Sequence, residues 1–141
     1  MQTLLAAQLR KRWWYLLAVV VTIAVGLTSR RYPQMLPACL GKYPGDALWS
    51  LMVFFGLGIL FRKASSLQLG LGTLGFSFGI EALKLCQAPW LVSVRHTTLG
   101  QLVFGNVFSW QNLLAYTIGA IVGVLIELLF SSRLARWTTK R

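Results

Sequence analysis

The sequence predicts an all-α membrane protein, with four transmembrane helices in a single transmembrane domain over residues 1–141 and with both termini in the cytoplasm. Two observations predict this class. Hydrophobic residues make up 56% of the 141 residues and charged residues only 12%, whereas charged residues make up about 25% of a typical soluble protein. Four apolar stretches also approach the length of about 20 residues with which a helix crosses the hydrocarbon core of a bilayer.

The first predicted span covers residues 13–29. It follows a basic cluster at residues 10–12, as the apolar part of a secretory signal would. The run ends in Ser29-Arg30-Arg31, however, without a small-residue cleavage pattern. We therefore expect a retained helix and not a cleaved leader.

The second and third predicted spans are residues 46–61 and 67–86. They form an antiparallel hairpin because only a short basic connection joins them. The second span is the shortest, and we expect it to extend back into residues 43–45. The third span carries Glu81 and Lys84 among its apolar and small residues.

The fourth predicted span covers residues 110–130. The segment before it, residues 87–109, ends in a stretch that is too apolar and glycine-rich for a solvated loop. Irregular backbone is allowed at membrane depth only where protein covers it or where it lines a wet cavity. We therefore expect part of this segment to be interfacial or re-entrant and to pack against the helices.

Basic residues near the span ends predict the orientation. With the N-terminus inside, nine of the 14 Lys and Arg residues fall on the inner side and four on the outer side, while Lys84 lies within a span. All six tryptophans fall near span ends, as an interfacial aromatic belt requires.

The net charge of +11 also raises the possibility of nucleic-acid binding. The basic residues lie in short clusters beside apolar spans, and no basic face alternates with stacking aromatic residues, as such a binder would need. Clusters of this kind are attracted to anionic headgroups. The predicted partners are therefore membrane lipids and not nucleic acid.

The three acidic residues, Asp46, Glu81 and Glu127, all lie in or at the end of an apolar stretch. A charged side chain inside a span costs about 2.5–3.5 kcal/mol or more, so by default it marks a functional or assembly site. On the predicted topology most of the polar residues gather near the outer face. They form a candidate ligand-binding or partner-binding site, made of Asp46, Glu81, Lys84, Gln87, Arg95 and Asn112.

Structural roles compete with this hypothesis. Asp46 could be the N-cap or first-turn acid of the second span, and Asn112 could cap the fourth. Glu81 and Lys84 are three residues apart, hence neighbours on a helix, and could form a buried structural pair. For Glu127 we expect a structural ion pair with Arg133.

The sequence predicts no metal site, no cofactor and no catalytic residue. No spacing of His, Cys and carboxylate residues suggests metal binding, and no nucleophile lies beside a base. The single His96 is expected to be an ordinary loop residue. Cys39 and Cys86 both fall on the predicted outer side, where they could pair or stay free. These observations lean against an enzyme.

Small residues predict helix packing in the last two spans. Glycines permit close approach of helices, within one bundle or between two copies of the chain in a homodimer. In the fourth span they share a helical stripe with Asn112, Tyr116 and Glu127. The glycines concerned are Gly72, Gly75, Gly79, Gly119 and Gly123.

The order Glu81…Gln87…Arg95…Asn112-x-x-x-Tyr116, followed by two glycines four apart, resembles the VanZ-like membrane proteins of bacteria. Over about residues 31–127 the chain is similar, more closely still, to a small related bacterial family of unknown function. The sequence departs from the VanZ-like pattern at two positions. Where that family has Asp, this chain has Asn112, and where the family has Asn, this chain has Tyr116. The resemblance implies that Glu81, Gln87, Arg95 and Asn112 are site positions, and it implies cell-envelope biology in the bacterial inner membrane.

Two functions follow as hypotheses. In the first, an extracytoplasmic polar pocket binds or handles a lipid or envelope intermediate, whose phosphate Arg95 and Lys84 would attract. In the second, the chain is an accessory subunit of a larger membrane protein complex. A transporter, channel or intramembrane enzyme is less favoured, because 141 residues are few and no inverted repeat is visible.

Overall fold

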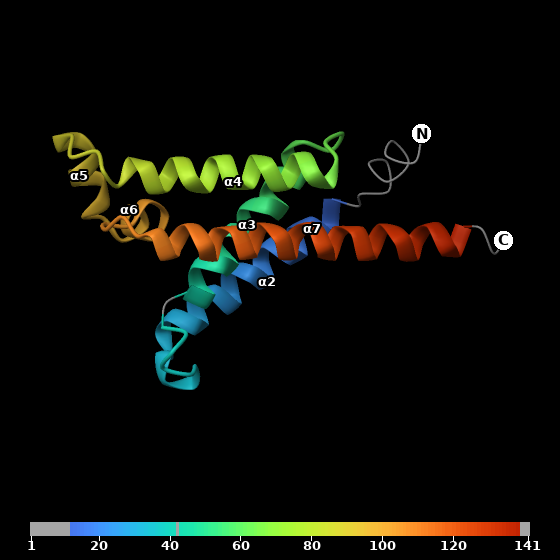
Figure 1. The fold of residues 1–141 in the computed structure, drawn as a ribbon, viewed down its shortest axis with the longest axis horizontal. Coiled ribbons are helices and arrows are strands. Elements are labelled where there is room, and N and C mark those ends of the chain that lie inside the picture. Colours follow the sequence, from blue (N-terminus) through green and yellow to red (C-terminus); the bar gives the residue numbers. More distant parts are fainter. Residues whose placement is uncertain (1–11, 42, 139–141) are drawn as a thin grey trace.

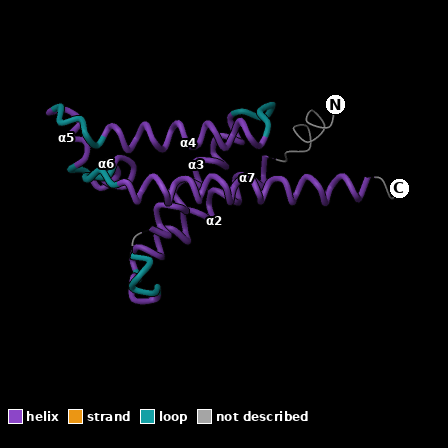
Figure 2. The backbone as a smooth tube through the Cα atoms, viewed as in Figure 1, coloured by secondary structure: helices purple, strands orange, loops and turns teal. Residues whose placement is uncertain are grey.

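A computed structural model describes residues 12–41 and 43–138, and all regular structure in them is helical (Figures 1 and 2). Three short helices lie in the connections: η1 (Pro33–Met35), α5 (Pro89–Arg95) and α6 (Thr98–Phe104). The prediction of an all-α protein is confirmed for this part of the chain. The four long helices are α2 (Arg12–Arg31), α3 (Tyr43–Leu60), α4 (Ser66–Leu83) and α7 (Trp110–Thr138).

Three of the long helices are apolar enough to cross a membrane, namely Trp13–Arg31, Tyr43–Leu60 and Trp110–Phe130. They correspond to the first, second and fourth predicted spans, and the second extends back to residue 43 as expected. α4 has the necessary 18 residues, but it is not among the three apolar helices. The length and apolar composition of these three helices therefore support a membrane protein with three spans.

α4 ends at Leu83, three residues before the predicted end of the third span. The backbone N–H groups of the next three residues bond to carbonyls three positions back, with N···O distances of 3.0–3.1 Å. Such bonds tighten the last turn of a helix and end it. Residue 86 consequently lies beyond the helix.

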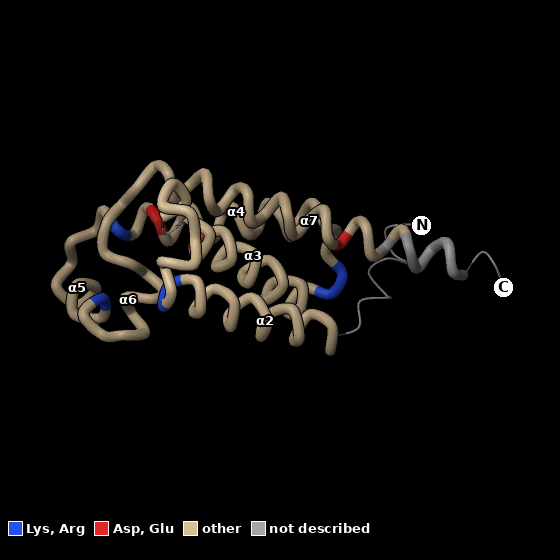
Figure 3. Tube along the Cα trace, turned by 90° about the horizontal axis from the view of Figure 1, so that it is seen from below, with Lys and Arg blue, Asp and Glu red and all other residues tan. Residues whose placement is uncertain are grey.

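α3 occupies the middle of the bundle and packs against α2, α4 and α7, while α4 also packs against α7. Figure 1 shows α4 and α7 running side by side in opposite directions, with the hairpin of α2 and α3 lying obliquely across them. α5 and α6 lie at the end where α4 stops and α7 starts. The described charged residues gather toward the two ends of the bundle (Figure 3).

The contact between α3 and α7 depends on two of the predicted packing glycines. A methyl group at position 119 would come within 2.2 Å of the carbonyl oxygen of Ala47. A methyl group at position 123 would come within 2.6 Å of the ring of Phe54, which is fully buried in the core. Glycine at both positions lets the two helices touch along their backbones.

The glycines of α4 lie differently from the sequence expectation. Methyl groups at Gly75 and Gly79 would meet nothing within 4 Å, and one at Gly72 would make only an ordinary contact of 3.4 Å with Leu57. α4 packs instead through its opposite face, which includes Gly70 and Glu81. The polar face of this helix is thus its packing face within the chain, because Glu81 finds its partners there.

The connections are built from local hydrogen bonds. Ser65 and Gln68 form a capping box at the start of α4: the Ser65 Oγ accepts from the Gln68 N–H (3.2 Å), and the Gln68 Oε1 accepts from the Ser65 N–H (2.8 Å). Each satisfies an otherwise unpaired N–H at the helix start. Thr97 caps α6 in a similar way, through Gly100. The expected packed segment before the last helix is the α5–α6 pair, of which α6 contacts α4.

Candidate functional site

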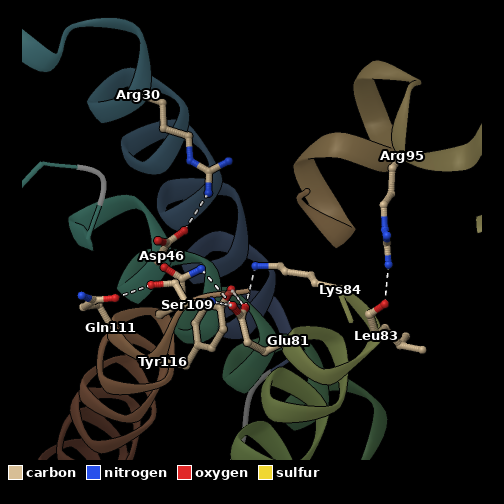
Figure 4. Close-up of polar contacts among 10 residues, drawn as sticks. Arg30, Asp46, Glu81, Leu83, Lys84, Arg95, Ser109, Gln111 and Tyr116 are labelled. Carbon is tan, nitrogen blue, oxygen red and sulfur yellow. Dashed lines mark hydrogen bonds and ion pairs between the residues drawn. The ribbon is translucent and has the colours of Figure 1, made fainter. Parts of the chain in front are cut away.

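The centre of the candidate site is the carboxylate of Glu81, in the last turn of α4, which is 0% exposed. Its Oε1 accepts hydrogen bonds from the backbone N–H of Ser109 (2.7 Å) and from Nδ2 of Asn112 (3.2 Å). Its Oε2 accepts from Nζ of Lys84 (2.5 Å) and from the hydroxyl of Tyr116 (3.2 Å). Figure 4 shows Lys84, Ser109 and Tyr116 around Glu81, and we refer to these four residues and Asn112 as the Glu81 cluster.

The start of α7 explains why a carboxylate is held here. Ser109 immediately precedes α7, and the first N–H groups of a helix lack intrahelical partners and carry partial positive charge. Glu81 supplies the anion for this helix start from a different helix. Asn112 therefore does not act as the cap that the sequence suggested, because α7 begins at Trp110 and the amide of Asn112 donates to Glu81.

Lys84 balances the charge of Glu81 inside the protein. It is buried, and the two residues form an ion pair at a spacing of three along the chain. Gly105, in the connection between α6 and α7, has a φ of 62° and lies directly on this side chain: a methyl group there would come within 3.0 Å of the Lys84 Cε. Glycine is required at that point both by its backbone conformation and by the proximity of Lys84.

A second ion pair lies nearby, between Arg30 at the end of α2 and Asp46 in α3, with 3.1 Å between Nη2 and Oδ1. α3 begins at Tyr43, so Asp46 is in the first turn of the helix but is not its N-cap. The helix can start earlier because Pro44 is tolerated in a first turn. Gly45 leaves room for Arg30, since a methyl group there would come within 3.1 Å of the Arg30 Nε.

Tyr116 connects the Glu81 cluster to α3. The ring of Trp49, one turn after Asp46, lies 5.5 Å from the ring of Tyr116 between centroids. The hydroxyl of Ser50 donates to the backbone carbonyl of Tyr116 (2.8 Å). Figure 4 draws both ion pairs in the same region of the bundle.

Arg95 lies beside this cluster but does not join it. It is 5% exposed, at the end of α5, and its Nη2 donates to the backbone carbonyl of Leu83. Figure 4 shows it reaching Leu83 away from the head group of Lys84. Among the described residues, the Nε of Arg95 has no hydrogen-bond partner and its guanidinium forms no ion pair. Arg95 thus contacts the carbonyl end of α4, where the helix dipole is negative, and keeps an unbalanced charge.

The buried Oδ1 of Asn112 and Oγ of Ser77 also have no hydrogen-bond partner among the described residues. Ser77 lies one turn before Glu81 on the same face of α4. Buried polar atoms without partners cost free energy. Hydrogen-bonding capacity therefore remains beside the Glu81 carboxylate, although that carboxylate already accepts four hydrogen bonds.

The remaining sequence candidates lie outside this arrangement. Gln87 is exposed, and its amide lies 3.5 Å from the carbonyl oxygen of Lys84. His96 is exposed at the end of α5. Cys39 and Cys86 are exposed and free in the structure. Within the described part of the chain, no three His, Cys, Asp or Glu residues gather as metal ligands.

Glu127 is buried near the far end of α7. The side chain of its expected partner, Arg133, lies outside the residues whose side chains the structure describes. The structural ion pair at this end stays a prediction.

Three members of the site escaped the sequence reasoning. Tyr116 was assigned only to a packing stripe, although its spacing of four from Asn112 places both on one face of α7. Ser109 contributes a backbone N–H, for which no side-chain signal exists. Arg30 was counted only as a flanking charge, because nothing in its neighbourhood points to a carboxylate 16 residues away.

Comparison with known proteins places the chain in a family. The sequence model of a family described as a protein of unknown function, DUF2809, matches residues 35–120. The matched range contains Asp46, Glu81, Arg95 and Asn112. No solved structure matches the chain. Because the match covers more than half of the 141 residues, the chain belongs to the DUF2809 family of proteins of unknown function.

Proposed function

We propose that this chain is a multi-pass protein of the bacterial inner membrane, of VanZ-like type, that binds the anionic group of a lipid or envelope intermediate at its outer end. In this proposal α4 is the fourth span and both termini are cytoplasmic. The three apolar helices support a membrane location. The antiparallel course of α4 and α7 supports a crossing by α4 (Figure 1).

The buried guanidinium of Arg95 carries the proposal. A charge out of water is costly unless an opposite charge and further hydrogen bonds compensate it. Arg95 is 5% exposed and, among the described residues, has a backbone carbonyl but no carboxylate as its partner. A phosphate or carboxylate ligand would supply the missing charge and an acceptor for the Arg95 Nε, and guanidinium groups recognise such anions through two parallel hydrogen bonds.

The Glu81 cluster has a supporting role in this proposal. The sequence hypothesis gave Lys84 and Arg95 equal parts in attracting a phosphate, but the charge of Lys84 is balanced by Glu81 at 2.5 Å. Glu81 joins the end of α4 to the start of α7, and Arg95 is anchored on that same end of α4 through Leu83. The cluster thus fixes the end of α4, to which Arg95 is hydrogen-bonded.

Thermal unfolding in mild detergent tests the role of Arg95. Dioctanoyl phosphatidic acid, which bears an exposed phosphate, should raise the Tm of the wild-type protein, whereas dioctanoyl phosphatidylcholine should not. Arg95→Gln should reduce this ligand-dependent rise. The matched control is Lys63→Gln, which removes one exposed cation from the connection between α3 and α4. An equal rise in Arg95→Gln and wild type would refute the proposal.

The exposed glycine face of α4 favours the second candidate, an accessory subunit of a membrane complex or a homodimer. Methyl groups at Gly75 and Gly79 would meet nothing within 4 Å, so another helix can approach closely there. Native mass spectrometry after mild extraction tests this candidate. A stoichiometric companion, or a second copy, that Gly75→Leu and Gly79→Leu each remove would support it; a companion that survives both would count against it.

A further inference from the structure

A shallow groove lies at the end of α2, where the chain turns into η1. Its volume is about 330 Å³, near the lower limit of about 300 Å³ for small-molecule sites. It is separate from the Glu81 cluster and from Arg95. Its lining residues are Ala24, Val25, Thr28, Ser29, Tyr32, Met35 and Leu36.

Two of the three hydroxyl-bearing residues that line the groove, Thr28 and Ser29, form hydrogen bonds with the backbone of α2. The Thr28 hydroxyl donates to the carbonyl of Ala24 (2.7 Å), and the Ser29 hydroxyl donates to the carbonyl of Gly26 (2.8 Å). Both hydroxyls are therefore satisfied by the backbone of α2 itself. The wall that remains is mostly methyl and aliphatic surface, which suits a hydrocarbon chain and offers little to a polar ligand.

Positive charge lies at the same end of α2 as this apolar wall. α2 ends in Arg30 and Arg31, and Arg30 is paired with Asp46. Arg31 is exposed and, in the part of the chain that the structure describes, forms no ion pair. The end of α2 thus carries two guanidinium groups, of which Arg30 is paired with the carboxylate of Asp46. The apolar helix Trp13–Arg31 ends here, so the groove lies at the depth where acyl chains meet headgroups.

We propose that this groove holds an acyl chain of an anionic phospholipid whose phosphate contacts Arg31. An acyl chain complements the apolar wall, and the phosphate complements the unbalanced cation. A zwitterionic lipid would fill the groove equally well but would gain less from Arg31. A free headgroup would lack the apolar contact altogether.

The experiment is native mass spectrometry of the full chain in mild detergent with equal amounts of dioleoyl phosphatidylglycerol and dioleoyl phosphatidylcholine. The wild type should retain phosphatidylglycerol in preference. Val25→Trp fills the groove and should weaken lipid retention about tenfold, as expected if a few methylene contacts are lost. Its matched control is Val21→Trp, one turn earlier on the same face and outside the groove, since the two valines are 48% and 50% exposed.

Arg31→Gln tests the charge without altering the groove. It should lower the preference for phosphatidylglycerol about fivefold, the effect of one cation near an anionic surface, and leave phosphatidylcholine retention unchanged. The difference in lipid retention between Val25→Trp and Val21→Trp should persist in an Arg95→Gln background, which separates this site from the anion site of the proposed function. Equal retention by Val25→Trp and Val21→Trp, or an unchanged preference in Arg31→Gln, would overturn the proposal.

Discussion

Glu81 shows how a carboxylate can be accommodated between apolar helices. Its two oxygens accept four hydrogen bonds, one of them from the positively charged Lys84. A buried charge is tolerated when an opposite charge and hydrogen bonds compensate it in this way. At the scale of single residues, Glu81 is therefore a structural anchor, whereas Arg95 is a buried cation with no balancing anion among the described residues.

Glu81→Gln should destabilise the protein strongly. The substitution leaves Lys84 buried without its counter-charge, and breaking a buried pair from one side costs about 3–5 kcal/mol. The free energy of unfolding in detergent measures this loss. The double variant Glu81→Gln/Lys84→Met removes both charges and should be more stable than Glu81→Gln alone. If the double variant is no more stable than the single one, the ion pair is not what Glu81 contributes.

The helices show which features a single sequence can predict. The three apolar helices could be located because their length and hydropathy are local properties of the chain, and the start of α3 at Tyr43 followed from the extension expected there. The pairing of faces could not be predicted in this way. α4 has a glycine face and a face with Glu81, and which of them packs on α7 depends on the helix start at Ser109, 28 residues away.

The candidate site could likewise be predicted only in part, because local sequence does not show which residues meet in the fold. Glu81 and Asn112 could be selected because polar residues are rare in apolar stretches, and the structure brings them together. Gln87 is also polar, but it lies beyond the end of α4 and is exposed. In this turn, Lys84 pairs with Glu81 at a local spacing of three and also lies against Gly105, a contact between distant parts of the chain that no local pattern reports.

Glycine substitutions should separate the two kinds of glycine at the scale of helices. Gly119→Ala places a methyl group 2.2 Å from the Ala47 carbonyl oxygen, and such overpacking costs about 1–3 kcal/mol. Gly75→Ala meets open space and should be neutral or stabilising by up to about 1 kcal/mol, because alanine favours helix. The difference in unfolding free energy between the two variants measures the α3–α7 contact. Equal effects would mean that this contact relaxes without cost.

The whole molecule is asymmetric along its helices. Both described ion pairs and Arg95 lie in one region (Figure 4), next to the connections between α2 and α3 and between α4 and α7. The opposite end carries the short basic connection between α3 and α4. Basic connections of this kind favour the cytoplasmic side, so the polar region should face outward. In the proposed function, the anion site would then face the outer side of the membrane.

Thiol labelling tests this orientation and the crossing by α4 together. Cys39 and Cys86 are free and exposed, and they lie in the two connections expected outside. A membrane-impermeant maleimide added to spheroplasts should label Cys39 in the Cys86→Ser variant and Cys86 in the Cys39→Ser variant. In a Cys39→Ser/Cys86→Ser background, the cysteine of Lys63→Cys should react only after the membrane is permeabilised. If α4 does not cross the bilayer, Cys86 will instead share the protection of position 63. Labelling of position 63 alone would mean that the protein is inserted the opposite way, which would place Arg95 and its ligand in the cytoplasm.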